Sequence, residues 1–288
     1  MLVGYDAMGR LFCNWILKGH SECLSGGCMN VFILTDVEGI AGVTDIDFMD
    51  RTGEKYLLAR QYLCDSINLA AKTCFDCGAE CVYYLDGHGG GGNVYEEKIN
   101  PRVQKCSIAE WQALLAEGKI DCQIELGAHA RAGTVGGFLD HTISSKTWFC
   151  HRVNGREMSE LSMHALVCGA YGVPVIACIG DEAACCQARE YIPDIYTGAV
   201  KRAEVRNEAT DYENTDEILV SAVREALANY QHVKPYRMEG ESVVELTFYR
   251  TDFCEKALAR CGVEVERVDA RTLRKKVERI TRYEDLKF

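Results

Sequence analysis

The chain has 288 residues, of which 48% are hydrophobic and 26% charged, which excludes a disordered or fibrous protein and suffices for one large domain or two smaller ones. Its formal net charge of -11 argues against a nucleic-acid partner, because binding phosphates requires a basic face. The longest apolar run, residues 173–179, contains Pro174 and is far shorter than the roughly 18 residues that span a bilayer. The sequence therefore predicts a soluble protein without a membrane partner.

The 16 cysteines make up about 6% of the 288 residues, below the roughly 8–10% of small disulfide scaffolds. Several, such as Cys122 and Cys178, lie within apolar runs, where a free thiol behaves as a small hydrophobic group. This pattern predicts a cytoplasmic protein. Cys74, Cys77 and Cys81 include one pair with metal-binding spacing, but no later C-x-x-C pair would complete a structural zinc site, and their role stays open.

The first 28 residues differ in character from the rest of the chain. They contain a short apolar stretch, but neither a basic segment before it nor a small-residue cleavage pattern after it, so they do not resemble a signal peptide. Met29 then opens a strong strand pattern. We therefore expect residues 1–28 to be a leader outside the domain, a start-site or cloning extension.

From Met29 on, apolar strand-like runs alternate with amphipathic segments of helical length, which predicts a three-layer αβα domain with a mostly parallel sheet. Helices are predicted over residues 54–77 and 157–171. Another helix is predicted to begin at Ser107, which has capping-box spacing with Glu110. Asn154 and Gly155 predict a tight turn. Strands are predicted at 30–35, 81–85, 122–126, 146–153 and 174–179.

Beyond residue 200 the composition becomes more charged and predicts a smaller α+β unit. It contains predicted helices at 215–230 and 252–261 and strands at 242–248 and 263–268. No proline-rich or Gly/Ser linker precedes it, so the two units are expected to pack closely. The expected domains are a metal-binding catalytic domain, residues 29–200, and a smaller domain, residues 201–288.

Residues that can bind metal ions follow three of the predicted strands: Asp36 and Glu38 after the first, His88 after the second and His129 after the third. Open α/β sheets bind ligands at the carboxyl ends of their strands, and residues two apart in an extended segment share a face. Two acids held together need a cation, and the imidazoles favour a metal such as zinc over calcium or magnesium. Any one of these residues would fit a solvated loop or a strand end, but together they predict a shared metal site.

Two further positions carry candidate groups. Glu160 and His164 have the i, i+4 spacing that can chelate a metal on a helix, although a solvated helix face is the plainer interpretation. His141 is a candidate acid–base group, because imidazole titrates near neutral pH. Glycines 89–92 lack the Lys-Ser/Thr of a phosphate-binding loop and are interpreted as a mobile loop beside the site.

The same residues carry a family resemblance through motifs that occur one after another in order. These are T-D-V-E-G (35–39), L-D-G-H (85–88), G-A-H-A-R-A (127–132), D-H-T (140–142), V-N-G-R-E-M-S-E-L (153–161), and Y-G-V-P-V (171–175) with G-D-E (180–182) after it. The sequence resembles the D-aminopeptidase family of dinuclear zinc metallopeptidases, clearly from Met29 to about residue 205 and more weakly beyond.

The resemblance implies two zinc ions per subunit and a ring-like homo-oligomer whose active sites face an internal chamber. His141 matches the family's catalytic histidine, Asp36 is the expected bridge between the ions, and His164 is not needed as a ligand. The implied zinc ligands are Asp36, Glu38, His88, His129 and Glu160.

The predicted activity is that of an aminopeptidase acting on short peptides, with D-residues favoured on the resemblance. Two zinc ions lower the pKa of a shared water and polarise the scissile carbonyl, so that a metal-bound hydroxide attacks the amide. Two alternatives stay open: a non-catalytic peptide-binding or transport accessory protein, and a dinuclear metallohydrolase of another amide or of a phosphoester. The full set of presumptive ligands with His141 argues against the first, because binding alone would not require them.

Overall fold

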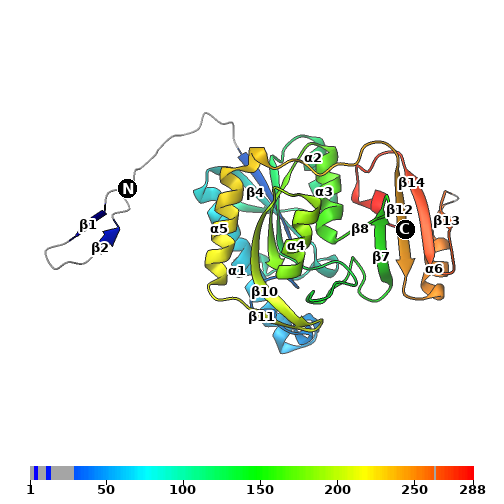
Figure 1. Ribbon diagram of the computed structural model, residues 1–288, viewed down its shortest axis with the longest axis horizontal. Helices are drawn as coiled ribbons and strands as arrows, with labels where there is room; N and C mark the ends of the chain where they lie inside the picture. Colours follow the sequence, from blue (N-terminus) through cyan, green and yellow to red (C-terminus); the bar gives the residue numbers. More distant parts are fainter. Residues whose placement is uncertain (1–2, 6–10, 14–28, 263) are drawn as a thin grey trace.

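The computed structural model describes residues 3–5, 11–13, 29–262 and 264–288 (Figure 1). Two short strands, β1 (Val3–Tyr5) and β2 (Leu11–Cys13), pair antiparallel. The rest of the predicted leader, residues 1–28, lies outside the described residues. From Met29 on, the chain builds a seven-stranded and a five-stranded sheet with helices packed around them.

The seven-stranded sheet has the order β11-β10-β9-β6-β3-β4-β5, and β11 pairs antiparallel while the other pairings are parallel. The chain runs from β3 to the β5 edge and then returns to place β6 on the other side of β3. This reversal creates the switch point at which open α/β sheets bind ligands. The strands are β3 (Met29–Thr35), β4 (Ala79–Asp86), β5 (Val103–Lys105), β6 (Cys122–Ala128), β9 (Val175–Asp181), β10 (Tyr196–Val205) and β11 (Glu208–Asp211).

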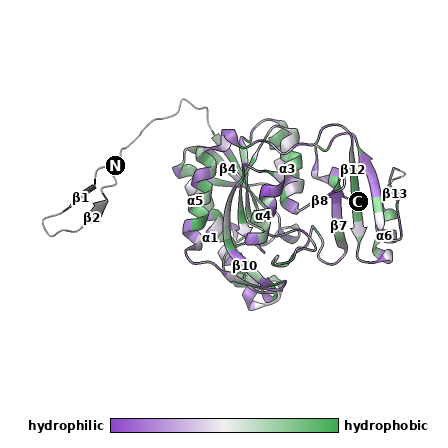
Figure 2. Ribbon diagram, in the orientation of Figure 1, coloured by the Kyte–Doolittle hydropathy of each residue, from purple (hydrophilic) through white to green (hydrophobic). Residues whose placement is uncertain are grey.

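Helices cover both faces of this sheet (Figure 1). Helices α1 (Glu54–Asp76) and α5 (Thr215–Ala228) pack together on one face, and α2 (Ile108–Ala116), α3 (Glu160–Ala170) and α4 (Glu182–Tyr191) lie on the other. All residues of β6 and β9 are buried, as strands covered on both faces require. Figure 2 shows hydrophobic and hydrophilic residues on each of the covering helices, as one-sided packing against a sheet produces. The predicted three-layer α/β architecture is confirmed.

The smaller sheet is antiparallel and has the order β13-β14-β12-β7-β8. Asn154 and Gly155 form the predicted turn between β7 and β8, both with positive φ. Helix α6 (Thr251–Leu258) packs against this sheet. Its strands are β7 (Trp148–Val153), β8 (Arg156–Glu157), β12 (Ser242–Phe248), β13 (Glu266–Arg267) and β14 (Thr272–Val277).

Five short 3-10 turns complete the described part of the chain: η1 (Ile46–Met49), η2 (His88–Gly90), η3 (Glu96–Lys98), η4 (Tyr230–His232) and η5 (Tyr283–Leu286). No helix in the described ranges is both long enough and apolar enough to cross a membrane.

Some elements differ from the sequence-based expectation. The helix predicted over 157–171 begins only at Glu160, because Glu157 pairs with Arg152 in the β7–β8 hairpin and Ser159 caps the helix. The strand predicted at 263–268 is the short β13, and the main strand of that region is β14. No element was predicted over 182–195, where α4 lies.

The predicted boundary near residue 201 falls inside β10, a single continuous strand of the main sheet. Strand β11 and helix α5 also pack with the main sheet, although they come after that boundary. Conversely, β7 and β8 precede it and belong to the smaller sheet. The sheets therefore divide the chain by strand pairing rather than at one point in the sequence, and the existence of two separate domains stays a prediction.

The close contact between β6 and β9 generates a test of this packing. A Cβ atom on Gly180 would lie 2.0 Å from the carbonyl oxygen of Ala128, which is backbone and cannot turn aside. We expect Gly180→Ala to lower the free energy of unfolding by about 1–3 kcal/mol, measured by denaturant titration. Gly262→Ala is the matched control, since its Cβ would meet nothing within 4 Å. Equal stability of the two variants would contradict this account of the strand contact.

Candidate metal centre

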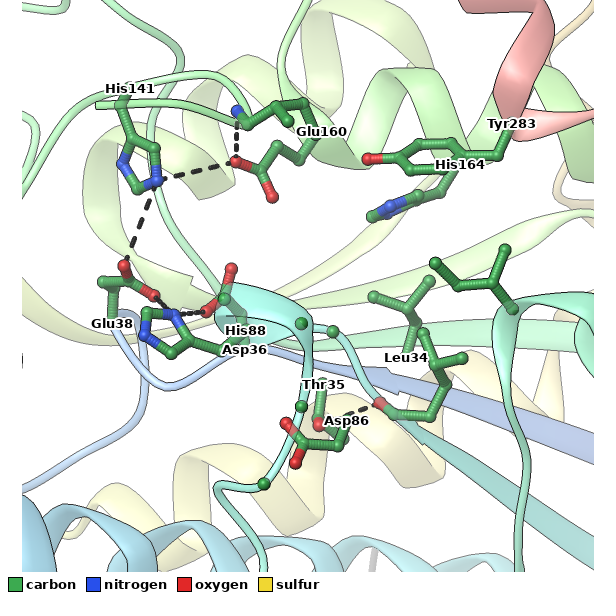
Figure 3. Close-up of a pocket in the computed structure, with 18 of the residues that line it drawn as sticks. Leu34, Thr35, Asp36, Glu38, Asp86, His88, His141, Glu160, His164 and Tyr283 are labelled. Atoms are coloured by element: carbon green, nitrogen blue, oxygen red, sulfur yellow. Dashed lines mark hydrogen bonds and ion pairs between the residues drawn. The ribbon is translucent and has the colours of Figure 1, made fainter. Parts of the chain in front are cut away.

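Six side chains singled out in the sequence gather at the carboxyl ends of three neighbouring strands, at the switch point of the sheet. Figure 3 labels all of them except His129. They are Asp36 and Glu38 after β3, His88 after β4, His129 after β6, His141 in the loop before β7, and Glu160 at the start of α3.

The two carboxylate oxygens of Asp36 face two different groups of side chains. Oδ1 lies 3.0 Å from Nδ1 of His88, and Oδ2 lies 3.5 Å from Nε2 of His129. Glu38 joins the first group with Oε2 2.6 Å from the same His88 nitrogen, and Glu160 joins the second with Oε1 3.4 Å from the same His129 nitrogen. Asp36 therefore stands between two sets of donors, as a bridging carboxylate does.

His141 lies over the second group. Its ring stacks on that of His129, with centroids 4.2 Å apart and planes 8° apart. Its Nε2 is 3.7 Å from Oε1 of Glu160 and 4.0 Å from Oε1 of Glu38. The donor atoms of His129, His141 and Glu160 lie within 4.8 Å of one another, so the position suits a ligand as well as a proton-transfer group.

The loop around His141 is held in an uncommon backbone conformation. Leu139 and Ile143 have φ values of 48° and 62°, a region that costs a branched or bulky residue on the order of 1–3 kcal/mol. The carbonyl of Leu139 accepts a 2.7 Å hydrogen bond from Nδ1 of His141, and the N–H of Ile143 donates one of 2.7 Å to Oε1 of Glu160. These bonds turn Nε2 of His141 toward the carboxylates.

A close approach of two backbones brings Asp36 beside His129. The N–H of Asp36 donates to the carbonyl of Leu126 at 2.8 Å, and that of Gly39 donates to the carbonyl of Gly127 at 2.9 Å. Gly127 has a φ of 85°, and a Cβ there would lie 2.0 Å from the carbonyl oxygen of Asp36. Glycine is therefore required at position 127 for the ends of β3 and β6 to meet.

Asn93 is fully buried and anchors the glycine-rich loop that begins at His88. Its Nδ2 donates to Oδ1 of Asp86 and to the carbonyl of His88, both at 2.7 Å. Its Oδ1 accepts from the Tyr56 hydroxyl at 2.6 Å and from Arg51 at 3.3 Å. This network fixes the backbone of His88 relative to β4.

The pKa values of Asp36 and Glu38 are shifted in opposite directions. Burial and the neighbouring charge of Asp36 raise the pKa of Glu38. Burial acts in the same direction at Asp36, but the close contacts with Glu38, His129 and His88 outweigh it and hold the pKa of Asp36 well below its usual range. Two carboxyl groups this close share a proton unless a cation neutralises them.

The same carboxylates hold two imidazoles in their charged form. Burial by itself would lower the pKa of His88, but Glu38 and Asp36 raise it to about 11. Asp36 and Glu160 likewise overcome burial and raise the pKa of His129 well above its usual value. The close contact with His129 in turn outweighs burial at Glu160 and lowers its pKa to about 2.

Two predicted ligands carry buried polar atoms without a hydrogen-bond partner among the described residues, Oε2 of Glu38 and Nε2 of His129. The close contact of this Glu38 oxygen with His88 is not aligned as a hydrogen bond. Nδ1 of His129 lies 3.0 Å from the carbonyl of Ala130 and donates to it, so in the neutral ring the lone pair is on Nε2. Carboxylate oxygens and imidazole nitrogens are zinc ligands, and the residues present fit two such ions.

A cavity of about 1050 Å³ opens over these side chains. The metal-capable residues other than His129 line it, together with glycines 89–92. Its lining also includes Trp111, His164, Tyr283 and Lys287. The volume suits a small ligand rather than a folded protein.

The structure thus brings together all five predicted ligands and His141, while their roles stay predictions. His164 contacts Glu125 rather than Glu160, with Nδ1 3.2 Å from Oε2. Neither metal-capable group found among the described residues includes Cys74, Cys77 or Cys81.

Sequence reasoning missed four residues that shape the site, Arg51, Asn93, Tyr283 and Lys287. Arg51 contacts the backbone of glycines far from it in the chain, and Asn93 hydrogen-bonds the distant side chains of Tyr56 and Arg51. Tyr283 and Lys287 lie in a terminal segment without a periodic pattern. The one usable signal was Asn93 directly after four glycines, because a polar side chain there can hydrogen-bond the loop.

Comparisons with known proteins cover almost the whole chain from Met29 on. The family model described as D-aminopeptidase matches residues 29–285. A D-aminopeptidase of Bacillus subtilis (strain 168) is 29% identical over 243 residues, which are 83% of this chain and 88% of the relative. A solved structure, the Zn-dependent D-aminopeptidase DppA from Bacillus subtilis, a self-compartmentalizing protease, is similar with a TM-score of 0.82 and 26% identity, covering 90% of this chain and 95% of the other.

The raised pKa values predict that metal binding expels protons. His88 and His129 are protonated at neutral pH in the metal-free protein, and a nitrogen must lose its proton to bind zinc. Zinc titration at pH 7.5 in buffers of different ionisation enthalpy is expected to show release of about two protons per subunit, with apparent affinity rising with pH. Binding without proton release would contradict the ligand assignment.

Whereas zinc affinity is expected to rise with pH, the free energy of unfolding of the metal-free protein is expected to fall as pH rises. The ion pairs of His88 stabilise the fold fully below its ordinary pKa of 6.5, and this contribution is lost as pH rises through about 11.

Proposed function

The chain belongs to the D-aminopeptidase family of peptidases, and from this premise we propose that it is a zinc-dependent aminopeptidase that hydrolyses short peptides containing D-amino acids. The observation that carries the proposal is the position of Asp36, whose two oxygens face two separate sets of donors. A single-metal site or a plain peptide-binding groove would not require this arrangement.

We assign the zinc ligands by the group in which each side chain lies. Glu38 and His88 would hold one ion and His129 and Glu160 the other, and Asp36, which lies between the two groups, would contribute to both. When bound, the two ions supply an activated water at neutral pH and polarise the scissile carbonyl. The side chains around them would orient the substrate amide, and Glu38 and His129 are themselves buried, which limits the access of bulk water.

His141 is assigned the proton-transfer role. Its Nδ1–H donates to the carbonyl of Leu139, so Nε2 is the nitrogen that faces the cavity. In that position it stabilises the developing charge on the amide or donates a proton to the leaving amine.

We further propose a cytoplasmic homo-oligomer. All thirteen cysteines within residues 29–262 are free thiols, in keeping with a reducing compartment. The description of the solved relative as self-compartmentalizing supports an assembly of several subunits around a chamber.

Metal analysis combined with a substrate screen tests the proposed function. We expect two zinc ions per subunit, hydrolysis of D-dipeptides faster than of L-dipeptides, and loss of activity with a chelator that zinc restores. The screen includes aminoacyl amides and a phosphodiester, because dinuclear sites serve both chemistries. Turnover of the phosphodiester alone, or zinc binding with no turnover of any substrate, would replace the proposal with one of the two alternative functions.

His141→Ala distinguishes a catalytic residue from a ligand. We expect the variant to keep two zinc ions while kcat falls roughly 100-fold, as loss of a proton-transfer group does. His129→Ala should lose zinc, and the exposed His232→Ala is the matched control with normal zinc content and rate. Lost zinc in His141→Ala would make His141 a ligand, and an unchanged kcat would remove it from the mechanism.

A further inference from the structure

A chain of buried polar side chains runs beneath the metal centre and takes no part in it. Nε1 of Trp111 donates to Oε1 of Gln123 at 2.8 Å, and Nε2 of Gln123 donates to Oε1 of Glu125 at 2.7 Å. Oε2 of Glu125 lies 3.2 Å from Nδ1 of His164. The chain leads from the core to His164, which lines the cavity.

Burying a carboxylate and an imidazole is unfavourable unless the pair is well satisfied, and apolar side chains of similar size would serve packing as well. Glu125 and His164 are only 4% and 7% exposed. Burial would lower the pKa of His164, but Glu125 outweighs burial and raises it. Because Glu125 occupies Nδ1, Nε2 of His164 is the nitrogen left for a ligand in the cavity.

Tyr283 and Lys287 lie beside His164, and the three side chains form one wall of the cavity. The Tyr283 ring lies 5.2 Å from that of His164, and Nζ of Lys287 lies 4.1 Å from the centroid of the Tyr283 ring. In Figure 3 the Tyr283 hydroxyl and the His164 ring point toward the part of the cavity that holds Glu160. Burial and the nearby carboxylates raise the pKa of Tyr283, so its hydroxyl stays a neutral donor.

Lys287 forms no ion pair with any carboxylate in the described part of the chain, unlike Lys105 on the same cavity, which pairs with Glu96. Burial lowers the pKa of Lys287, in agreement with an ammonium group that is partly withdrawn from water. The wall therefore presents hydrogen-bond donors and one unpaired positive charge.

The spacing between this wall and the metal centre matches a short peptide. Glu160 and His164 are four residues apart on α3, so they lie about one helical turn, roughly 5.4 Å, from each other along one helix face. An extended peptide advances about 3.3–3.6 Å per residue. A group that lies one or two residues beyond the scissile bond therefore reaches the wall.

We propose that His164, Tyr283 and Lys287 form a subsite that binds the free C-terminal carboxylate of a di- or tripeptide whose scissile amide lies at the metal centre. This inference rests on the proposed peptidase function. Glu125 acts as a positioning residue, since it orients His164 without contacting the substrate. The subsite selects free acids of short peptides over C-terminal amides, because an amide offers no negative charge to Lys287.

The test compares a D-dipeptide with the same dipeptide bearing a C-terminal amide, using the zinc-loaded full chain. The wild-type protein is expected to favour the acid in kcat/KM by roughly tenfold or more, the usual effect of hydrogen bonds to a charged group. Lys287→Met should lower this acid-to-amide ratio about tenfold, chiefly through the KM of the acid. Tyr283→Phe and His164→Gln should lower the same ratio.

Lys276→Met is the matched control, because Lys276 lies on β14 and pairs with Glu241 at the surface. Zinc content and melting temperature are measured for every variant. Lys287 is only half-buried, so Lys287→Met can still be measured if His164→Gln fails to fold.

An unchanged acid-to-amide ratio in Lys287→Met would overturn the subsite. If the Glu125–His164 pair were purely structural, His164→Gln would be less stable and would hydrolyse the acid and the amide more slowly to the same extent. Its acid-to-amide ratio would then equal that of the wild-type protein. A wild-type protein that hydrolyses the acid and the amide equally would refute the subsite but keep the peptidase. Hydrolysis of neither peptide would refute the peptidase itself.

Discussion

Three carboxylates and two imidazoles cannot lie together in a buried crevice unless their charges are balanced, and the rest of the site depends on this constraint. Without a metal ion the balance is kept by protons, which explains why the pKa values of His88 and His129 rise while that of Glu160 falls to about 2. Zinc ions bound between the same atoms would also neutralise the carboxylates. Each ion carries two positive charges and favours a tetrahedral arrangement of ligands. The centre is therefore a place where protons and metal ions compete.

The backbone around the centre is shaped to hold these charges close. Glycine at 127 allows the end of β6 to contact the backbone of Asp36, and the positive φ values of Leu139 and Ile143 bring His141 over Glu160. Such conformations are unfavourable in isolation and persist because hydrogen bonds and packing fix them. The strain and the buried charge lie in the same few residues, as expected for a site built for chemistry rather than stability.

The cavity is lined by two chemically different groups of side chains. One group is the carboxylates of the candidate metal centre, and the other is His164, Tyr283 and Lys287. With the proposed subsite, a peptide with a free amine and a free carboxylate matches both groups only when it is short enough for its carboxylate to reach the second group. Length selection can therefore arise within one subunit, in addition to any restriction from an assembly.

The sequence by itself determined the alternating α/β pattern, the order of the strands along the chain and the placement of Asp36, Glu38, His88 and His129 after strands. These features are local, since side-chain periodicity and the residues just beyond a strand can be read along the chain. The residues alone also marked Glu160 and His141 as candidates, and the family motifs gave them the roles of ligand and catalytic histidine. Only the tertiary structure decided that β10 continues through residue 201 and that β7 and β8 join the smaller sheet. It alone also decided that Tyr283 and Lys287 line the cavity and that Asn93 anchors the loop at His88. These depend on contacts between distant residues, and the packing that selects such contacts leaves no periodic trace in the sequence.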